Sequence, residues 1–364
     1  MWEPFGPGAG RRVTVPECHQ VLVLVPHVVA GTRLMDVVPL LAGDPRLQVV
    51  CTVPPGSPPG TEEFVLSRRL LAVPWDSALR HRFDLVVAAS GQATDLVHGP
   101  AVVLPHGASA AKSRRLHGHG LDRASLTRRG RVVPEAIMLA HDDELELLAD
   151  ACPEALPRAV VAGDICFDRM RASLPFRARY RAAAGIGEDE ELVTITSTWS
   201  PASMFGSRIP LYRELSRQGR TAAVLHPNIW QVHGEWQVRA WLADCPGLIV
   251  VPPEEGWRAM VIASDAVVCD HGSVSQYSAA LGVPVVLAGT PPVRPDSFAD
   301  LLARQAPLLD PGAPVVPQAR RVPLAISSRP GEAAAVLRRT MYRLLDLPEP
   351  ARDCRAEPVP VHRA

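Results

Sequence analysis

The segment Val267–Leu287, reading VVCDHGSVSQYSAALGVPVVL, constrains the fold more than any other part of the chain. An apolar strand runs into Asp-His-Gly-Ser, a helix opens there, and Gly-Val-Pro returns the chain to a second apolar strand. A strand, a helix and a strand in this order form a βαβ unit, in which the two strands are parallel. Its hinge is polar, and open parallel sheets bind ligands at the carboxyl ends of their strands.

The hinge suits an anion. Gly272 has no Cβ, so the backbone can turn tightly there and come close to a ligand. The N–H groups that begin the helix, and the hydroxyls of Ser273 and Ser275, are expected to point outward. Helix N-termini carry unsatisfied donors and partial positive charge, so the expected guest is a phosphate or pyrophosphate. The alternative is that Ser273 only caps the helix.

Length and composition indicate two ordinary globular domains. A chain of 364 residues is too long for one typical domain. Apolar residues make up 47% of it and charged residues 21%, which is typical of a globular protein. Basic and acidic residues number 38 each, so the formal charge is zero. Bulk charge therefore gives no reason to expect binding to nucleic acid or to an acidic membrane face.

The cysteines and the apolar runs indicate a cytoplasmic protein. The seven cysteines are scattered and never spaced as C-x-x-C, so neither a disulfide framework nor a zinc knuckle is expected. No apolar run approaches the roughly 20 residues that span a bilayer. The N-terminus, MWEPFGPGAGRR, lacks the hydrophobic segment of a secretory signal.

In the first half of the chain, short apolar runs alternate with helix-like stretches, which is typical of a parallel, doubly wound sheet. The predicted strands are Gln20–Val25, Leu47–Val53, Phe83–Ala89, Ala101–Leu104, Pro134–Leu139 and Ala159–Val161. The predicted helices are Thr32–Leu41, Glu62–Leu71 and Asp142–Asp150.

A second alternating series follows the segment Arg171–Glu190, which has a different composition and no strand pattern. Its predicted strands before the opening feature are Leu192–Ser197, Thr221–Leu225 and Leu248–Val251. After a proline-rich crossing segment, Pro307–Pro323, the sequence predicts a helix over Gly331–Leu345. We therefore expect an N-terminal domain over residues 13–175, a C-terminal domain over 188–330, a helix at 331–346 that crosses back, and a loose tail over 347–364.

A histidine follows one of the predicted strands of the first half. In LPHGASAAKSRR, His106 lies on a glycine-hinged loop, and Lys112 and Arg114 behind it are candidate acceptor-binding or charge-stabilising groups. Histidine suits general base work because its ordinary pKa of about 6.5 leaves the neutral form plentiful near pH 7. The alternative is a histidine that only hydrogen-bonds backbone in a turn.

The second half carries further polar groups after its strands. TSTWSPASMFG supplies the hydroxyls of Ser197 and Thr198, and AAVLHPNIW ends a strand with His226 followed by a proline that fixes the turn. His271 is a further candidate for contact with phosphate or nucleotide. Since the carboxyl ends of parallel strands share one sheet edge, these groups are expected near Gly272. A structural role for His226 is the alternative.

Taken in order, these clusters resemble the CDP-glycerol glycerophosphotransferases, which polymerise or prime teichoic-acid-type chains on the GT-B fold. LPHGASAAK resembles the family's W-H-G-T-P-x-K element, VVAGDICFDRM its strand–G-x-P-R-x-D-x-x segment, TSTWSP its P-T-W loop and LHPN its H-P element. SDAVVCDHGSVSQYSAALGVPVV resembles its A-D-x-L-I-T-D-Y-S-S-x-x-x-D-x-x-x-x-x-x-P-I signature, the most specific of these matches. The chain departs from the family at Pro105, where tryptophan is usual, and in the lost later aspartate of the signature.

The resemblance implies an α/β protein of the GT-B fold, with two Rossmann-like, doubly wound parallel-sheet domains facing a cleft. It places the family's two catalytic histidines on His106 and His226, and its phosphate-gripping serine on Ser273. The donor and phosphate site is expected to comprise Ser197, Thr198, Asp270, His271, Gly272, Ser273 and Val274. No Asp-rich metal cradle such as D-x-D stands out, so we expect no metal ligands and no tightly bound cofactor.

The implied activity is transfer of a polyol phosphate from a CDP-linked donor, such as CDP-glycerol, to a hydroxyl of a cell-envelope polymer or glycolipid, with release of CMP. A lipid-linked acceptor would bring the protein to the inner face of the membrane. The alternative is a GT-B glycosyltransferase with a UDP-sugar donor, because Asp-His-Gly-Ser also approaches the H-G-G and D-S-G-G loops of nucleotide-sugar enzymes. A third reading is a nucleotide-binding protein without catalysis.

Overall fold

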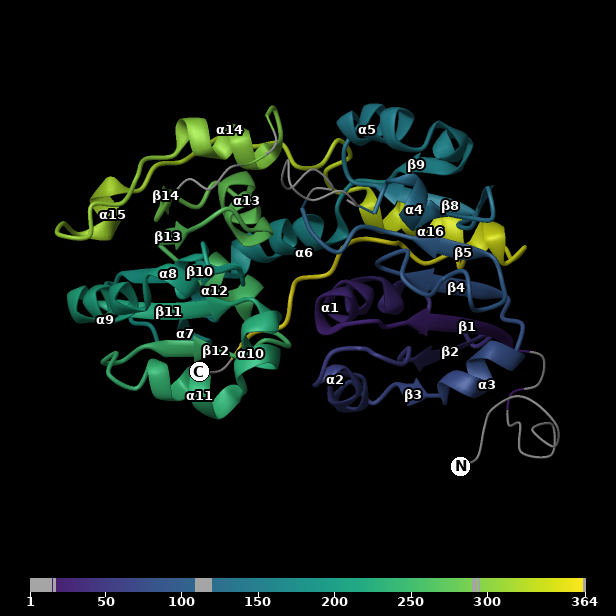
Figure 1. The fold of residues 1–364 in the computed structure, drawn as a ribbon, viewed down its shortest axis with the longest axis horizontal. Coiled ribbons are helices and arrows are strands. Elements are labelled where there is room, and N and C mark those ends of the chain that lie inside the picture. The colour runs from purple at the N-terminus through teal and green to yellow at the C-terminus, as the bar shows by residue number, and fades with distance from the viewer. Residues whose placement is uncertain (1–14, 16–17, 109–119, 290–292, 294, 363–364) are drawn as a thin grey trace. The chain divides into compact units, whose positions relative to one another are not determined.

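The computed structural model describes residues 15, 18–108, 120–289, 293 and 295–362 (Figure 1). The chain divides into two compact units. Of the described residues, unit 1 comprises 15, 18–108, 120–166 and 327–356, and unit 2 comprises 167–289, 293, 295–326 and 357–362. Each unit is built around one parallel sheet, which confirms the predicted α/β class with two Rossmann-like halves.

The sheet of unit 1 has seven strands, all parallel. They are β1 (His19–Leu24), β2 (Leu47–Thr52), β3 (Leu71–Ala72), β4 (Leu85–Ala88), β5 (Ala101–Val103), β8 (Ala136–Leu139) and β9 (Ala159–Val161). Their order is β3-β2-β1-β4-β5-β8-β9, so the direction of winding reverses between β1 and β4. Such a switch point is where open α/β sheets bind ligands.

Two helices of unit 1 differ from their predicted bounds. Helix α1 (Val28–Val37) begins four residues before the expected Thr32, because the side chain of His27 caps it. It gives way to a 3₁₀ turn at Val38–Leu40, where Pro39 has no N–H to continue the helix. Helix α2 (Thr61–Ser67) stops before the expected Leu71, because Arg69 turns left-handed with φ 56° and the chain enters β3.

The remaining elements of unit 1 are helices and a separate two-stranded hairpin. They are α3 (Trp75–Arg80), α4 (Arg123–Leu126), the antiparallel hairpin β6 (Thr127–Arg128) and β7 (Arg131–Val132), α5 (Asp143–Ala151), the 3₁₀ segment Pro153–Arg158 and α16 (Ala333–Leu344). Helix α6 (Ile165–Ser173) begins in unit 1 and continues into unit 2.

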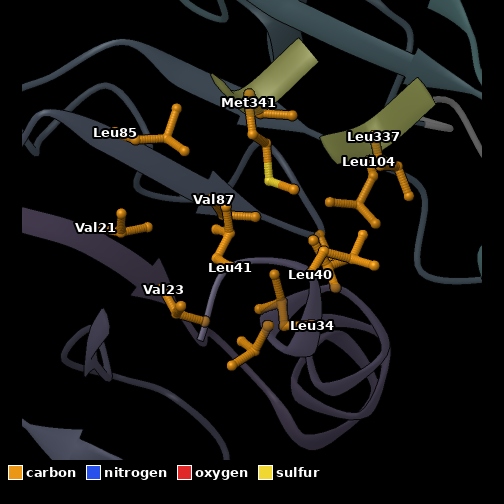
Figure 2. Close-up of a cluster of buried hydrophobic side chains, with 14 of the residues drawn as sticks. Val21, Val23, Leu34, Leu40, Leu41, Leu85, Val87, Leu104, Leu337 and Met341 are labelled. Atoms are coloured by element: carbon orange, nitrogen blue, oxygen red, sulfur yellow. The ribbon is translucent and has the colours of Figure 1, made fainter. Parts of the chain in front are cut away.

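The helix that was predicted to cross back, α16, packs into the core of unit 1. Figure 2 shows its Leu337 and Met341 among side chains of the sheet and of α1. Val21 of β1, Val87 of β4 and Leu34 of α1 belong to the same buried cluster. Truncating a fully buried leucine or methionine in such a core to alanine costs about 2–5 kcal/mol. The last helix is therefore an integral part of the N-terminal fold.

The sheet of unit 2 has five strands, again all parallel. They are β10 (Leu192–Ser197), β11 (Arg220–Leu225), β12 (Ile249–Val251), β13 (Ala266–Cys269) and β14 (Val285–Leu287), in the order β12-β11-β10-β13-β14. The switch point lies between β10 and β13. The helices are α7 (Arg177–Ala183), α8 (Met204–Ser207), α9 (Ile209–Gln218), α10 (Pro227–His233), α11 (Glu235–Trp241), α12 (Trp257–Ala263), α13 (Ser273–Ala280), α14 (Phe298–Gln305) and α15 (Val315–Gln318).

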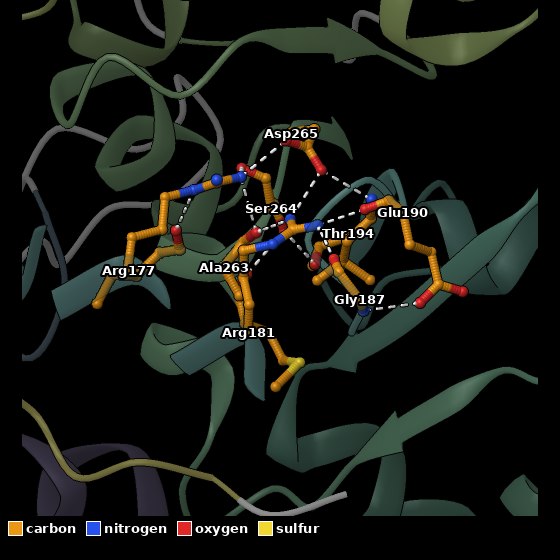
Figure 3. A network of polar contacts seen from close by, with 11 residues as sticks. Arg177, Arg181, Gly187, Glu190, Thr194, Ala263, Ser264 and Asp265 are labelled. Atoms are coloured by element: carbon orange, nitrogen blue, oxygen red, sulfur yellow. Dashed lines mark hydrogen bonds and ion pairs between the residues drawn. The ribbon is translucent and has the colours of Figure 1, made fainter. Parts of the chain in front are cut away.

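The segment that was predicted to separate the domains, residues 171–190, belongs instead to unit 2. Arg177 donates to Asp265 over 2.7 Å, and the buried Arg181 donates to the other oxygen of the same carboxylate over 2.9 Å (Figure 3). Burial alone would raise the pKa of Asp265, but the Leu192 N–H and the two guanidinium groups hold it below its ordinary value. These bonds fasten α7 to the sheet, and the border between the units falls at residues 166 and 167.

The expected crossing segment, Pro307–Pro323, also stays in unit 2. Its main chain bonds the outer edge of β14: Leu309 N–H donates to Leu287 O over 2.9 Å, and Val285 N–H donates to Arg320 O over 2.8 Å. Exposed strand edges favour aggregation, so this segment protects the sheet.

The end of the chain, for which the sequence predicts a loose tail, is fixed in its described part. Val359 is buried; its carbonyl accepts from the Tyr180 hydroxyl over 2.6 Å, and its N–H donates to the Ser173 hydroxyl over 2.9 Å. Arg169 also donates to the carbonyl of Glu357 over 3.0 Å. Buried Val359 and bonded main-chain groups thus hold the last described residues, which form neither helix nor strand.

Candidate functional site

The carboxylate of Asp270 joins two loops at the switch point of unit 2. It follows β13 and is almost fully buried, with 4% exposed. One oxygen accepts from the N–H and the hydroxyl of Thr198, which follows β10, over 2.8 Å each. The other accepts from the Gly272 N–H over 3.1 Å. Protein donors therefore bond to both oxygens, and the carboxylate links the loops after β10 and β13.

Gly272 is required by close packing at this corner. A Cβ built on it would lie 2.9 Å from the Thr198 methyl carbon, closer than carbon atoms pack. Its φ of −74° is ordinary, so the requirement concerns space and not backbone conformation. The glycine lets the loops after β10 and β13 approach each other closely.

Helix α13 begins at this corner with Ser273 as its first residue. The capping position is Gly272, which has no side chain. The alternative interpretation, in which Ser273 caps the helix, is therefore wrong. Among the described residues, the N–H groups of Ser273 and Val274 have no acceptor. Ser275 differs from the expectation: its side chain is buried and its hydroxyl donates back to the Gly272 carbonyl. Two backbone donors at a helix N-terminus thus remain for an anion.

Further buried polar side-chain atoms near the corner have no hydrogen-bond partner in the described chain. Both side-chain polar atoms of Gln276, in α13, are buried without a partner in the described chain, and so is Nδ1 of His271. Gln276 is only 1% exposed. Buried polar groups are nearly always hydrogen-bonded, so unpartnered ones point to a ligand or water. The groups nearest the α13 N-terminus therefore lack the partners that a polar ligand would supply.

Ser197 is the last residue of β10, as predicted, and its hydroxyl bonds within the protein. Its hydroxyl donates to the Thr198 carbonyl and accepts from the Phe205 N–H, each over 2.8 Å. It thus ties the loop after β10 to the first turn of α8, and its hydroxyl both donates and accepts inside the protein. The loop that carries Thr198 is thus held at both ends.

His226 lies at the carboxyl end of β11 and caps α10. Its Nδ1 accepts from the Asn228 N–H over 3.1 Å, so in the neutral ring the proton is on Nε2. The indole of Trp199, in the loop after β10, lies beside it, with ring centroids 6.2 Å apart and planes tilted by 40°. His226 thus lies at the same sheet edge as the corner, and its neutral ring carries the proton on Nε2.

His106 lies near the switch point of unit 1, after β5. Its Nδ1 is 2.9 Å from the carbonyl of Ala89, which follows β4. A carbonyl only accepts, so Nδ1 carries the proton and Nε2 is the basic nitrogen of the neutral ring. The two predicted histidines therefore have opposite tautomers, His106 that of a base and His226 that of a donor.

His27, which was not among the predicted site residues, lies beside His106 in unit 1. It follows β1, its Nδ1 accepts from the Ala30 N–H over 3.1 Å, and its ring meets that of His106 edge to face. The signal was present, since Pro26-His27 ends a strand before a helix just as His226 does. Lys112 and Arg114 lie outside the described residues.

The described part of the chain carries neither a cluster of metal ligands nor a helix that could span a membrane. No group of three or more His, Cys, Asp or Glu side chains there could hold a metal ion. In the same residues, no helix combines the length and the apolar character needed to cross a bilayer.

No family model matches the sequence, and no curated protein matches it either. Solved structures do match the fold. A variant of the wall teichoic acid polymerase TagF matches with a TM-score of 0.51 and 13% identity, over 75% of this chain and 70% of that one. The UDP-GlcNAc 2-epimerase from Methanocaldococcus jannaschii matches with a TM-score of 0.52 and 11% identity, over 89% and 99%. These likenesses show the GT-B fold that the sequence predicts.

Proposed function

We propose that the protein is a transferase with a nucleoside-diphosphate-linked donor, and that it moves a polyol phosphate from a CDP-linked donor such as CDP-glycerol to a hydroxyl acceptor. The acceptor class is a cell-envelope polymer or a glycolipid, and the released product is CMP. A lipid-linked acceptor would hold the protein at the inner face of the membrane.

The corner at Gly272 carries this proposal. It combines a switch point of a parallel sheet with two backbone donors at the start of α13 and buried polar atoms, and these donors and atoms have no partner in the described part of the chain. A diphosphate has the charge and the acceptor oxygens that such a corner lacks. The hydroxyl of Ser273 is a further donor for it.

In the proposed reaction, Nε2 of His106 takes the proton of the acceptor hydroxyl. The acceptor oxygen bonds to the distal phosphorus of the donor, the bond from that phosphorus to the bridging oxygen breaks, and CMP leaves with the electron pair. The Nε2–H of His226 donates to the oxygens that gain charge, and the N–H groups of α13 do the same. The tautomers imposed by Ala89 and Asn228 support this division of roles.

The alternative is transfer of a sugar from a UDP-linked donor. It needs the same diphosphate corner and a base, so most of the geometry fits both reactions. The likeness to a UDP-GlcNAc 2-epimerase over nearly the whole of both chains supports this alternative, as the likeness to a teichoic acid polymerase supports the first.

Binding separates the two donors. In a thermal-shift panel of CDP-glycerol, CDP, UDP, UDP-sugars and GDP-sugars, we expect the cytidine compounds to raise the melting temperature most. Stabilisation by UDP-sugars together with no response to any cytidine nucleotide would instead select the sugar donor.

Turnover then tests the histidines. With the selected donor and a hydroxyl acceptor, His106→Ala should lower kcat by about 10²-fold or more while nucleotide affinity stays nearly unchanged. The matched control is His98→Ala, which removes an exposed histidine of the same unit. Equal activity in the two variants would exclude His106 as the base.

A further inference from the structure

Trp199 is a large apolar side chain placed in water beside the candidate site. Its residue is 59% exposed, although the loop around it is tightly bonded. The preceding residue, Thr198, is held through both its N–H and its hydroxyl by the buried Asp270. Trp199 is therefore exposed on a loop whose backbone is firmly held by hydrogen bonds, and a disordered loop does not explain its exposure.

The position of Trp199 relates it to the diphosphate corner. Thr198 touches Gly272 closely enough that no Cβ fits between them, and Gly272 precedes α13, whose first two N–H groups have no acceptor in the described chain. On its other side, the indole has His226 as a ring neighbour. Trp199 therefore stands at the sheet edge between the proposed phosphate grip and the proposed charge-stabilising histidine.

We infer that the indole of Trp199 is a stacking platform for a ring carried by the donor diphosphate, and this inference rests on the proposed function. Aromatic side chains bind nucleobases by stacking, and the same flat face accepts the apolar side of a sugar ring. The shared chemistry is a ring attached to a diphosphate. Burying the indole under such a ring would also remove its cost of exposure to water.

The platform bears on the choice of donor. Glycerol has no ring, so with CDP-glycerol the indole can stack only on cytosine or ribose. A nucleotide sugar offers its hexose as a second ring. Comparing a nucleoside diphosphate with the corresponding nucleotide sugar thus shows which ring lies on the indole.

The test is titration of the full-length protein with CDP, UDP and a UDP-hexose. Tryptophan fluorescence and isothermal calorimetry measure the binding. The chain has seven tryptophans, so Trp199→Phe identifies the signal of this one. We expect ligand to quench the wild-type fluorescence, and Trp199→Phe to lose the quench while keeping Kd within about 3-fold, because phenylalanine still stacks. Trp199→Ala should weaken binding by about 5- to 150-fold.

Trp236→Phe is the matched control, since Trp236 in α11 is even more exposed, at 80%. It should keep both the quench and the wild-type Kd. A quench by UDP equal to that by the UDP-hexose places the base on the indole, and a larger effect of the UDP-hexose places the sugar there.

The outcomes separate this inference from the function beneath it. If the wild type binds and Gly272→Ala weakens binding while Trp199→Ala leaves Kd within 2-fold, the platform is wrong and the diphosphate corner stands. If calorimetry detects no nucleotide binding by the wild type, the proposed function fails and the platform with it. Matching circular dichroism spectra of the variants exclude misfolding as the cause of either result.

Discussion

The imidazole rings of His27 and His106 meet edge to face in unit 1, with centroids 5.2 Å apart and planes at 82°. The two side chains come from the ends of different strands, β1 and β5, on either side of β4. The ring of His27 is held in place because its Nδ1 accepts from the Ala30 N–H and so caps α1. Its ring thus braces the proposed base, in addition to capping a helix.

Two substitutions of His27 separate these roles. Asparagine keeps an acceptor for the Ala30 N–H but removes the ring, so His27→Asn should keep the unfolding free energy within about 0.5 kcal/mol while lowering turnover by up to about 10²-fold. Phenylalanine keeps a ring and loses the cap, so His27→Phe should lose about 1 kcal/mol and retain more activity. Urea unfolding and initial rates measure the two effects. The reverse pattern would show that His27 acts only as a cap.

The sheets could be predicted in detail because their strands are continuous apolar runs. Strands β9 and β10 have the predicted bounds, and β2, β5 and β11 differ by one residue. The short strand β3 was missed, since Leu71–Ala72 follows a helical pattern and becomes a strand only through pairing with β2. Such pairing is a property of the tertiary fold, which a local pattern does not contain.

Gly272→Ala tests the close approach of the two loops. The new methyl would meet the Thr198 methyl, whose side chain is bonded to Asp270 and cannot simply rotate. We expect a loss of about 1–3 kcal/mol in unfolding free energy, as in other overpacked sites, together with weaker nucleotide binding. Gly219→Ala is the control, because a Cβ there meets nothing within 4 Å. Identical stability and Kd in the two variants would show that the corner tolerates a side chain.

Asp265 gives a prediction on acid stability. Its folded-state pKa lies below the unfolded value of about 3.9, so its contribution is complete above that pH and is lost as the pH falls through the folded pKa. The melting temperature of the wild type should therefore fall more between about pH 5 and pH 3 than that of Asp265→Asn. Asp44, whose pKa the Arg46 side chain lowers, remains in both proteins and keeps part of the slope.

At neutral pH the same variant should be less stable by up to about 3 kcal/mol, because Arg181 stays buried without its carboxylate. The control is Glu235→Gln, which breaks an exposed pair with Arg239 and should change stability by at most about 0.5 kcal/mol. Parallel pH curves for wild type and Asp265→Asn would contradict the assigned role. The bond between Arg181 and Asp265 joins residues 84 positions apart. A local sequence pattern does not contain such a contact, so the segment 171–190 was predicted to be a domain boundary.

The place of the candidate residues in the fold could be predicted, but not the hydrogen bonds that each of them makes. Gly272, Ser273 and Val274 lie at a helix N-terminus, as the strand–glycine–serine motif indicates. Asp270 and Ser197 were predicted to bind ligand, and in the structure their polar atoms hold loops together. A sequence shows which polar atoms are available but not which of them the protein itself uses.

Asp270→Asn tests whether that carboxylate acts through position. An amide can place its oxygen toward Thr198, but its NH₂ then faces the Gly272 N–H, and two donors meet in a buried place. We expect a loss of about 1–3 kcal/mol in unfolding free energy and a higher Kd for nucleoside diphosphates, measured by urea unfolding and calorimetry. Asp310→Asn is the matched control: its carboxylate accepts from the N–H of Gly312, also two residues on, over 3.0 Å but in an exposed turn, where water can replace the bond. Weakened binding with unchanged stability would mean instead that Asp270 contacts the ligand directly.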